Sequence, residues 1–380
     1  MEVNPFNPYY PAPDHLFSNR SREQRFFQRG LHSGLAERGG GPWNIALLGP
    51  WGIGKTSLLR RFARIAGTEK VEGKAILAIN VSATSAYSSF NEFARAFMRR
   101  FLDAVPRASF TREFEKWELF SVQVGTVTVR RKEEPPVEGA IEMLYRGLLS
   151  LWEESFSKKY AGVVVFIDDV QNLLEIHPKS LLALRTLFQD LQGTGARYPL
   201  VVTGPEILFG AVREVAEPVT RFFERMPILP FDQADTAEAV RHPLEAVGSN
   251  LKVEDEFVRK LYGKTLGHPY FIAFIMRDLV DAAYREGCDL TAELFDAHWE
   301  SIIGHLEMEK FEEEWRACTP AERKVLAALA RHPGAPVTKT FGKHRSLLGR
   351  LVDKGLVRRR ERGAYEIYHP LFAEFVRSFV

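Results

Sequence analysis

The stretch Gly49-Pro50-Trp51-Gly52-Ile53-Gly54-Lys55-Thr56 follows the pattern G-x-x-x-x-G-K-[ST]. Glycines in this pattern let backbone N–H groups turn towards phosphate oxygens, and the helix that follows points the positive end of its dipole at the same charge. The apolar run 44–48 before the loop reads as a buried strand, and residues 58–65 after it have helical spacing. Because the motif demands that context, we predict a nucleoside triphosphate site here rather than a glycine-rich turn that matches by chance.

The side chains at the end of this loop have separate predicted tasks. Lys55 would reach the β- and γ-phosphates, and Thr56 would be a ligand of Mg²⁺. The expected ligands are ATP and Mg²⁺, and the predicted binding residues are Gly49, Pro50, Trp51, Gly52, Ile53, Gly54, Lys55, Thr56 and Ser57.

A triphosphate site also needs a carboxylate near the metal, at the end of a neighbouring strand. Residues 161–167 are an almost continuous apolar run, the pattern of a central parallel strand covered on both faces, and Asp168 and Asp169 follow it. Asp168 would hold Mg²⁺ through water, and Asp169 would orient or deprotonate the attacking water. In the alternative, the pair only caps the next helix. The presence of a phosphate-binding loop in the same chain makes that alternative weaker.

The length and composition of the chain limit the classes of protein to which it can belong. At 380 residues it exceeds the usual single domain of about 100 to 200 residues, and its 45% hydrophobic content supports folded cores. No apolar run reaches the roughly 18 residues that span a bilayer, and the start lacks the pattern of a secretion signal. Cys288 and Cys318 lie far apart without other metal-ligand residues at suitable spacing, so no disulfide framework or zinc site is indicated. We expect a soluble, cytoplasmic protein with no membrane partner.

Strands and helices alternate with short connections up to about residue 230, which predicts an α/β fold with a parallel sheet covered by helices. Helical spacing alone follows, and then the order helix, helix, alternating tail, which is the layout of a winged helix-turn-helix. The predicted domains are an N-terminal lead-in segment (1–40), a P-loop ATPase core (41–230) with a hairpin insertion near 117–131, an α-helical lid (231–316) and a C-terminal winged helix (317–380).

The net charge of +2 hides an asymmetry along the chain. Residues 317–380 carry 13 Lys and Arg against 5 Asp and Glu, a net +8, whereas the rest of the chain carries a net −6. In a winged helix-turn-helix the second helix enters the major groove and the wing lies along phosphates, so this excess charge suits duplex DNA. The alternative is that the basic end docks on the acidic body of its own chain. The predicted DNA contacts are Lys343, Arg345 and Arg350 on or near the second helix and Arg358, Arg359 and Arg360 on the wing.

Three features together resemble a known family: the phosphate-binding loop, the apolar run ending in Asp168-Asp169, and a later strand ending in Thr203. They are similar to the AAA+ and STAND branches of the P-loop ATPases, the additional-strand class. The likeness covers roughly residues 15–380, since many members place a helical lid and a winged helix after the ATPase core. It looks most similar to the archaeal-type STAND ATPases, with origin-recognition and transposition ATPases as more distant cousins.

The resemblance implies further site residues. Thr203 would sense the γ-phosphate from a strand between the two Walker strands, although a hydroxyl that caps the next turn is an equal alternative. Arg221 or Arg225 would act as an arginine finger on a neighbouring subunit's ATP, unless it is an ordinary surface arginine. Pro269, after Gly267 and His268, would pack near the nucleotide. Asp169 departs from the Glu usual in AAA+ members, and the shorter side chain is compatible with a slow switch.

We therefore predict an ATP-driven molecular switch that contacts duplex DNA through its basic end and assembles with copies of itself when nucleotide is bound. Two alternatives of other classes stay open. In one, the chain is a signalling or defence ATPase whose winged helix binds protein. In the other, it is a nucleotide-binding scaffold with little hydrolysis that regulates a separately encoded effector.

Overall fold

The computed structural model describes residues 2–41, 43–83, 87–104, 137–206, 208, 219, 221–331, 345–361 and 364–379. The predicted hairpin insertion near 117–131 and Lys343 lie outside these residues. The chain divides into two compact units. Unit 1 comprises Met1–Asn19, Pro50–Gly54 and Leu229–Val380, and unit 2 comprises Arg20–Gly49 and Lys55–Ile228. The boundary therefore passes twice through the phosphate-binding loop.

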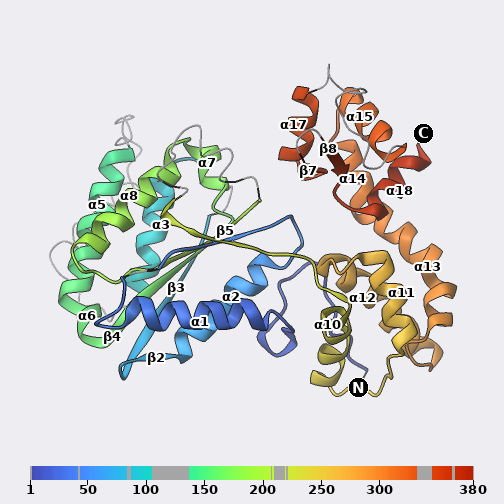
Figure 1. Ribbon diagram of the computed structural model, residues 1–380, viewed down its shortest axis with the longest axis horizontal. Helices are drawn as coiled ribbons and strands as arrows, with labels where there is room; N and C mark the ends of the chain where they lie inside the picture. Colours follow the sequence, from blue (N-terminus) through green and yellow to red (C-terminus); the bar gives the residue numbers. More distant parts are fainter. Residues whose placement is uncertain are drawn as a thin grey trace, which may run out of the picture. The chain divides into compact units, whose positions relative to one another are not determined.

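Unit 2 is built round a twisted sheet (Figure 1). The order of its described strands is β2-β3-β4-β5-β1-β6. The pairings are parallel except β2 with β3, which is antiparallel, so the sheet is mixed and mostly parallel. β5 lies between β1 and β4, which confirms the predicted additional-strand arrangement. The strands are β1 (Ile45–Leu48), β2 (Lys70–Val71), β3 (Lys74–Ser82), β4 (Tyr160–Asp168), β5 (Leu200–Gly204) and β6 (Glu224–Pro227).

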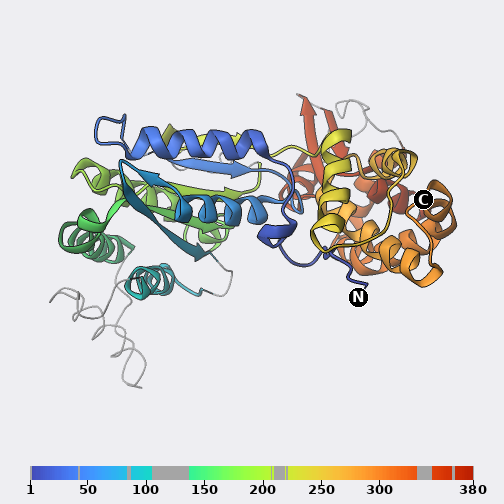
Figure 2. The ribbon, with the colours of Figure 1, turned by 90° about the horizontal axis from the view of Figure 1, so that it is seen from below.

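Helices cover both faces of this sheet (Figures 1 and 2). On one face Phe27 of α1 stacks on Phe62 of α2 with ring centroids 4.2 Å apart, and Phe27 also meets Phe166 of β4. On the other face α3, α5 and α8 form an apolar cluster with β4, which explains why residues 163–167 are fully buried. The helices are α1 (Ser21–Leu35), α2 (Lys55–Thr68), α3 (Phe90–Asp103), α5 (Val137–Leu151), the π-helical turn Trp152–Phe156, α6 (Ser157–Lys159), α7 (Asn172–Ile176) and α8 (Ser180–Gly193).

The first part of unit 1 is helical, as the sequence predicts, and glycines separate the helices. Replacing Gly267 by a residue with a side chain would destabilise the fold, because Gly267 has φ of 72° and a Cβ atom there would lie 1.8 Å from the carbonyl oxygen of Phe231. Gly287 ends α12 in the left-handed conformation. The elements are a 3₁₀ turn (Asp14–Leu16), α10 (Gln233–Ala246), α11 (Asp255–Thr265), α12 (Pro269–Glu286) and α13 (Ala292–Leu306).

The C-terminal part of unit 1 has the predicted order of helix, helix and two-stranded antiparallel sheet. Its first helix, α15, begins with a capping box, in which Thr319 N–H donates to Glu322 Oε2 at 2.8 Å and Glu322 N–H donates to Thr319 Oγ1 at 3.3 Å. The elements are the π-helical turn Glu307–Phe311, α14 (Glu312–Arg316), α15 (Pro320–Arg331), α17 (Arg345–Asp353), β7 (Val357–Glu361), β8 (Ala364–Ile367) and α18 (Pro370–Ser378). Within the described part of the chain, no helix has both the length and the apolar character to cross a membrane.

Candidate nucleotide site

The phosphate-binding loop joins the end of β1 to the start of α2. Gly49 N–H donates to the carbonyl of Gly204 at 3.3 Å, which ties the loop to the end of β5. Lys55 opens α2, and its Nζ donates to the carbonyl of Gly49 at 3.0 Å, closing the loop on itself. Gly54 has φ of 92°, a conformation that side-chain-bearing residues rarely adopt. The start of α2 therefore directly follows a glycine-lined turn, which is the arrangement that binds phosphate.

The amine of Lys55 lies in the electric field of two carboxylates. Burial lowers the pKa of Lys55, and the charges of Asp169 and Asp168 oppose that effect. Lys55 follows β1, while Asp168 is the last residue of β4 and Asp169 comes directly after it. The parallel sheet therefore brings together groups that are more than a hundred residues apart. A cation and two carboxylates gathered at the carboxyl ends of parallel strands in one sheet are placed to hold a triphosphate and its metal.

Thr203 connects the two carboxylate residues. Its Oγ1 donates to Asp168 Oδ1 at 2.5 Å and accepts a hydrogen bond from the backbone N–H of Asp169 at 2.8 Å. The side chain is completely buried. Both bonds cross from β5 to the end of β4, so the hydroxyl links the two carboxylate residues to β5.

The ligands that this site offers fit Mg²⁺. Thr56 supplies a hydroxyl and Asp168 a carboxylate, the hard oxygen donors that Mg²⁺ prefers. Among the described residues no group of three or more His, Cys, Asp or Glu could hold a metal ion.

The middle of the loop, residues 50–54, packs against the start of α12 inside unit 1. Tyr270 N–H donates to the carbonyl of Gly52 at 3.2 Å, and a Cβ atom on Gly52 would lie 2.8 Å from Tyr270 Cβ. The Trp51 ring meets the Tyr270 ring edge-on at 4.6 Å, and Lys310 Nζ lies 3.8 Å from the Trp51 centroid. Pro269 is the first residue of α12, so it lies next to this contact.

The comparison with protein families supports the same assignment. Residues 20–202 match the model described as "AAA ATPase domain". These residues are an AAA ATPase domain. Together with the Walker residues and the strand order, the match shows that residues 20–202 carry an AAA+ P-loop ATPase domain.

Solved structures share the fold across both units. A Walker-type ATPase of Pyrococcus abyssi is 18% identical, with a TM-score of 0.60 over 95% of this chain and 96% of that chain. The ORC2 protein of Aeropyrum pernix in ADPNP–ADP complexes is 15% identical, with a TM-score of 0.59 over 95% and 94%. The ORC1 protein of Aeropyrum pernix in complex with DNA is 17% identical, with a TM-score of 0.53 over 100% and 98%. No curated protein matches the sequence.

The two candidate arginine fingers lie at an edge of the AAA+ sheet. Arg225 is in β6, in register with Ala46, and Arg221 precedes that strand. Both are exposed. The sequence suggests a strand at 226–229, but the observed strand is 224–227, because an edge strand tolerates charged residues that weaken the apolar signal. β1 and β5 separate β6 from β4, so the fold does not gather these arginines with Asp168.

The predicted basic contacts are partly engaged within unit 1. Arg350 on α17 lies 3.6 Å from the buried carboxylate of Glu322, and Arg358 on β7 is ion-paired with Glu366 of β8. Arg359 is exposed on β7. The backbones of Arg345 and Arg360 lie in α17 and β7.

Sequence reasoning missed several residues of the site. Gln171 donates through Nε2 to Asp169 Oδ1 at 3.2 Å, and its only sequence signal is a polar side chain two residues after the carboxylate. Tyr270 and Lys310 reach the loop through packing inside unit 1. An aromatic residue at a helix start and a lysine on an acidic helix carry no pattern that predicts such a contact.

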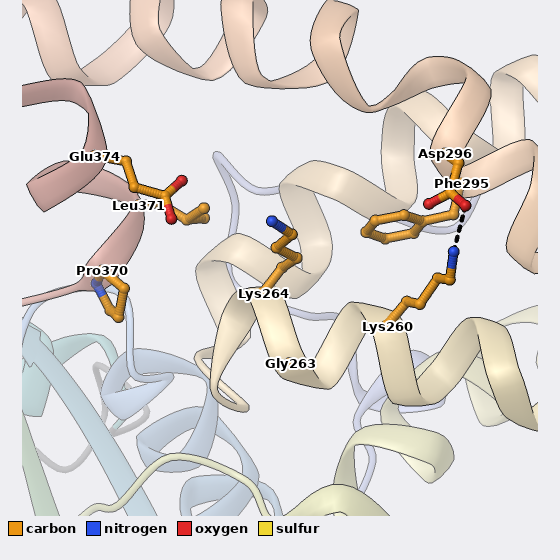
Figure 3. Close-up of a pocket in the computed structure, with 8 residues that line it drawn as sticks. All are labelled: Lys260, Gly263, Lys264, Phe295, Asp296, Pro370, Leu371 and Glu374. Atoms are coloured by element: carbon orange, nitrogen blue, oxygen red, sulfur yellow. Dashed lines mark hydrogen bonds and ion pairs between the residues drawn. The ribbon is translucent and has the colours of Figure 1, made fainter. Parts of the chain in front are cut away.

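A second hollow, of about 380 Å³, lies in unit 1 between α11, α13 and α18 (Figure 3). Lys260 pairs there with Asp296, and Lys264 and Glu374 extend towards one another across the space. Its lining residues are Lys260, Gly263, Lys264, Phe295, Asp296, Pro370, Leu371 and Glu374. Positive and negative side chains balance in this lining, and none of them is a predicted site residue.

Proposed function

We propose that this AAA+ ATPase is a molecular switch whose ATP cycle controls how its C-terminal winged helix meets duplex DNA. The observation that carries the proposal is the contact between the phosphate-binding loop and the start of α12. Tyr270 N–H donates to the carbonyl of Gly52 in the middle of that loop at 3.2 Å. A loop that binds phosphates while it contacts α12 lets bound nucleotide change the free energy of that contact, as a ligand-driven switch requires.

The residues divide the work of hydrolysis as follows. Lys55 and the first turn of α2 would bind the β- and γ-phosphates. Thr56 and Asp168 would hold Mg²⁺, which would neutralise charge on the transferring phosphoryl group. Asp169 orients the attacking water and takes its proton. The water oxygen forms a bond to the γ-phosphorus, the bond from that phosphorus to the β–γ bridging oxygen breaks, and ADP and inorganic phosphate leave. Thr203 holds the Asp168 carboxylate and the backbone of Asp169 in place through its two hydrogen bonds.

The DNA part of the proposal rests on the net +8 of residues 317–380 and on the order of elements in that segment. A structure similar to this one is that of an ORC1 protein in complex with DNA, which supports DNA as the partner by analogy. One observation favours a second candidate, a signalling ATPase whose winged helix binds protein. Arg350 and Arg358 already pair with Glu322 and Glu366, which leaves less charge for phosphates.

A motor form of the proposal adds assembly with copies of the chain. Arg221 or Arg225, exposed at the β6 edge, would then complete a neighbour's site by stabilising the charge of the transferring phosphoryl group. Light scattering with ATP and duplex DNA together should show an oligomer. A chain that stays monomeric under those conditions would exclude the motor form and leave the switch.

The test of the proposed function is steady-state ATP hydrolysis with and without duplex DNA at moderate salt, with Lys55→Ala as the blank. Stimulation by DNA would support the switch. Turnover indifferent to DNA would favour the signalling ATPase, and turnover no higher than that of the blank would point to a regulatory scaffold for a separately encoded effector.

A further inference from the structure

The turn after β4 is strained at the residue that the proposed function uses as its base. Asp169 has φ of 54°, in the left-handed region, which costs a residue with a Cβ atom about 1 kcal/mol or more. The surrounding bonds hold it there. Asp169 N–H is bound by Thr203 Oγ1, and its carbonyl accepts from Asn172 N–H at 3.0 Å. Strain that its neighbours maintain in this way commonly serves a site, here by fixing the direction of the Asp169 carboxylate.

Gln171 lies in the same turn and binds that carboxylate. Its Nε2 donates to Asp169 Oδ1 at 3.2 Å. A carboxylate oxygen only accepts hydrogen bonds, so the amide must present its nitrogen to Asp169 and its oxygen elsewhere. The orientation of the amide group is therefore fixed by chemistry.

The oxygen of that amide group points to a hydrogen-bond donor that a ligand or water would supply. Gln171 Oε1 is buried, and no donor from the described residues reaches it. A buried acceptor without a donor costs about 1 to 3 kcal/mol, so it is normally satisfied by a ligand or by water. Here it belongs to a side chain that touches Asp169, whose charge acts on the phosphate-binding Lys55.

We propose that Gln171 is a further catalytic residue of this ATPase, which accepts a hydrogen bond from the attacking water through Oε1 while Nε2 holds Asp169. The inference rests on the proposed role of Asp169 as the base. A water molecule has two hydrogens, and two acceptors, Asp169 Oδ2 and Gln171 Oε1, orient both of them. The oxygen lone pair is then directed at the γ-phosphorus, and the proton that leaves goes to Asp169. The second acceptor also compensates for the short reach of an Asp where a Glu is usual.

The experiment compares Gln171→Met with Gln28→Met in the full chain. Methionine keeps the length of glutamine and removes both hydrogen-bonding atoms. Gln28 is the matched control, because it is also half-buried and also donates through Nε2 to a carboxylate, Glu69 Oε1, at 3.0 Å, but on α1 away from the Walker strands. For Gln171→Met we expect kcat to fall about ten- to hundredfold, as for a misplaced reactant, while KM and the Kd of Mg-ATP change less than threefold. Gln28→Met should keep the kcat of the wild type.

Asp169→Ala and the double variant Asp169→Ala/Gln171→Met complete the test. If both residues act on one water, the kcat of the double variant should be no lower than the kcat of Asp169→Ala alone. Additive losses, or an unchanged kcat in Gln171→Met beside an active wild type, would overturn the role of Gln171. A wild type no faster than Lys55→Ala would instead overturn hydrolysis itself, so the two failures are distinguishable.

Discussion

At the residue scale, Thr203 is the side chain on which the proposed site most depends. We expect Thr203→Val, which keeps the shape and removes the hydroxyl, to lower kcat about ten- to hundredfold, because Asp168 loses a donor and the N–H of Asp169 loses its acceptor. Mg-ATP binding, measured by calorimetry, should weaken much less. Stability should fall by about 1 to 3 kcal/mol, since a buried N–H is left unpaired.

Thr236→Val is the control for that prediction. Thr236 is also completely buried, and its Oγ1 donates to the carbonyl of Asp232 at 2.7 Å, far from the Walker residues in the chain. It should lose comparable stability and keep its kcat. Equal kcat values for the two variants would mean that Thr203 has only a structural role.

The residues that the sequence predicted are those with a local signature. The loop at 49–56 and the carboxylates after the 161–167 run are contiguous motifs, so their chemistry can be read from spacing alone. Gln171 could not be found in this way, because its importance comes from one hydrogen bond and from the burial of one oxygen atom. The same holds for Lys310, which reaches Trp51 from a helix about 260 positions later in the chain.

At the element scale, Glu322 fastens α15 to α17. Its carboxylate is 1% exposed and is bound by Lys354 Nζ at 2.8 Å and by the N–H of Thr319. These two donors lower the pKa of Glu322 to about 2. Its stabilising contribution is therefore complete above about pH 4.5 and is lost as the pH falls towards 2.

We expect Glu322→Gln to lower the free energy of unfolding by about 2 kcal/mol at neutral pH, because it removes the charge that Lys354 and Arg350 share. Chemical denaturation measures this. Glu312→Gln, which breaks only the exposed pair with Arg316, should cost less than about 0.5 kcal/mol. Equal costs would show that the burial of Glu322 has no energetic consequence.

A second acid-sensitive link joins α11 to α18. His369 caps α18 by accepting from Leu371 N–H at Nδ1, so its Nε2 carries the proton that is donated to the carbonyl of Thr265 at 2.9 Å. Burial lowers the pKa of His369 to about 4. Protonation would destroy the cap, since both ring nitrogens would then be donors.

The sign of the pH effect follows from that shift. The unfolded chain binds the proton near pH 6.5 and the folded chain near pH 4, so stability is complete above pH 6.5 and falls by up to about 3 kcal/mol between these values. We expect His369→Asn, which retains a capping oxygen, to lose most of this slope in urea denaturation from pH 7 to 4. His298→Asn, at a half-buried histidine paired with Glu286, should retain it. A wild-type slope in His369→Asn would assign the effect to other groups.

Elements were predictable where periodicity was long. The central strand β4 and the helices α8, α10, α11, α12 and α13 follow from runs of nine or more residues. β2 was missed because two residues carry no period, and its antiparallel pairing with β3 depends on a tight turn through Gly73, which has φ of 82°. The difference between the predicted and observed bounds of β6 has a similar cause, since the polar side chains of Glu224 and Arg225 interrupt the apolar pattern of a strand.

At the scale of the whole molecule, the charge asymmetry decides between the two candidate partners. If the β7–β8 sheet lies along DNA phosphates, each arginine that neutralises a phosphate adds about 0.9 to the slope of log affinity against log salt. We expect Arg359→Ala to weaken binding to all duplex sequences alike and to reduce that slope by about 1. Arg358→Ala should reduce it less, because Arg358 must first leave Glu366.

Arg377→Ala is the charge-matched control for this measurement, since Arg377 is exposed on α18 and not on the β7–β8 sheet. Fluorescence anisotropy of a labelled duplex over a range of salt gives the slopes. If Arg359→Ala and Arg377→Ala weaken binding equally, the net +8 of residues 317–380 attracts DNA without a defined docking surface. If neither the wild type nor the variants bind DNA, the basic end serves to bind protein. The rest of the chain, with a net charge of −6, has the opposite charge that such binding would use.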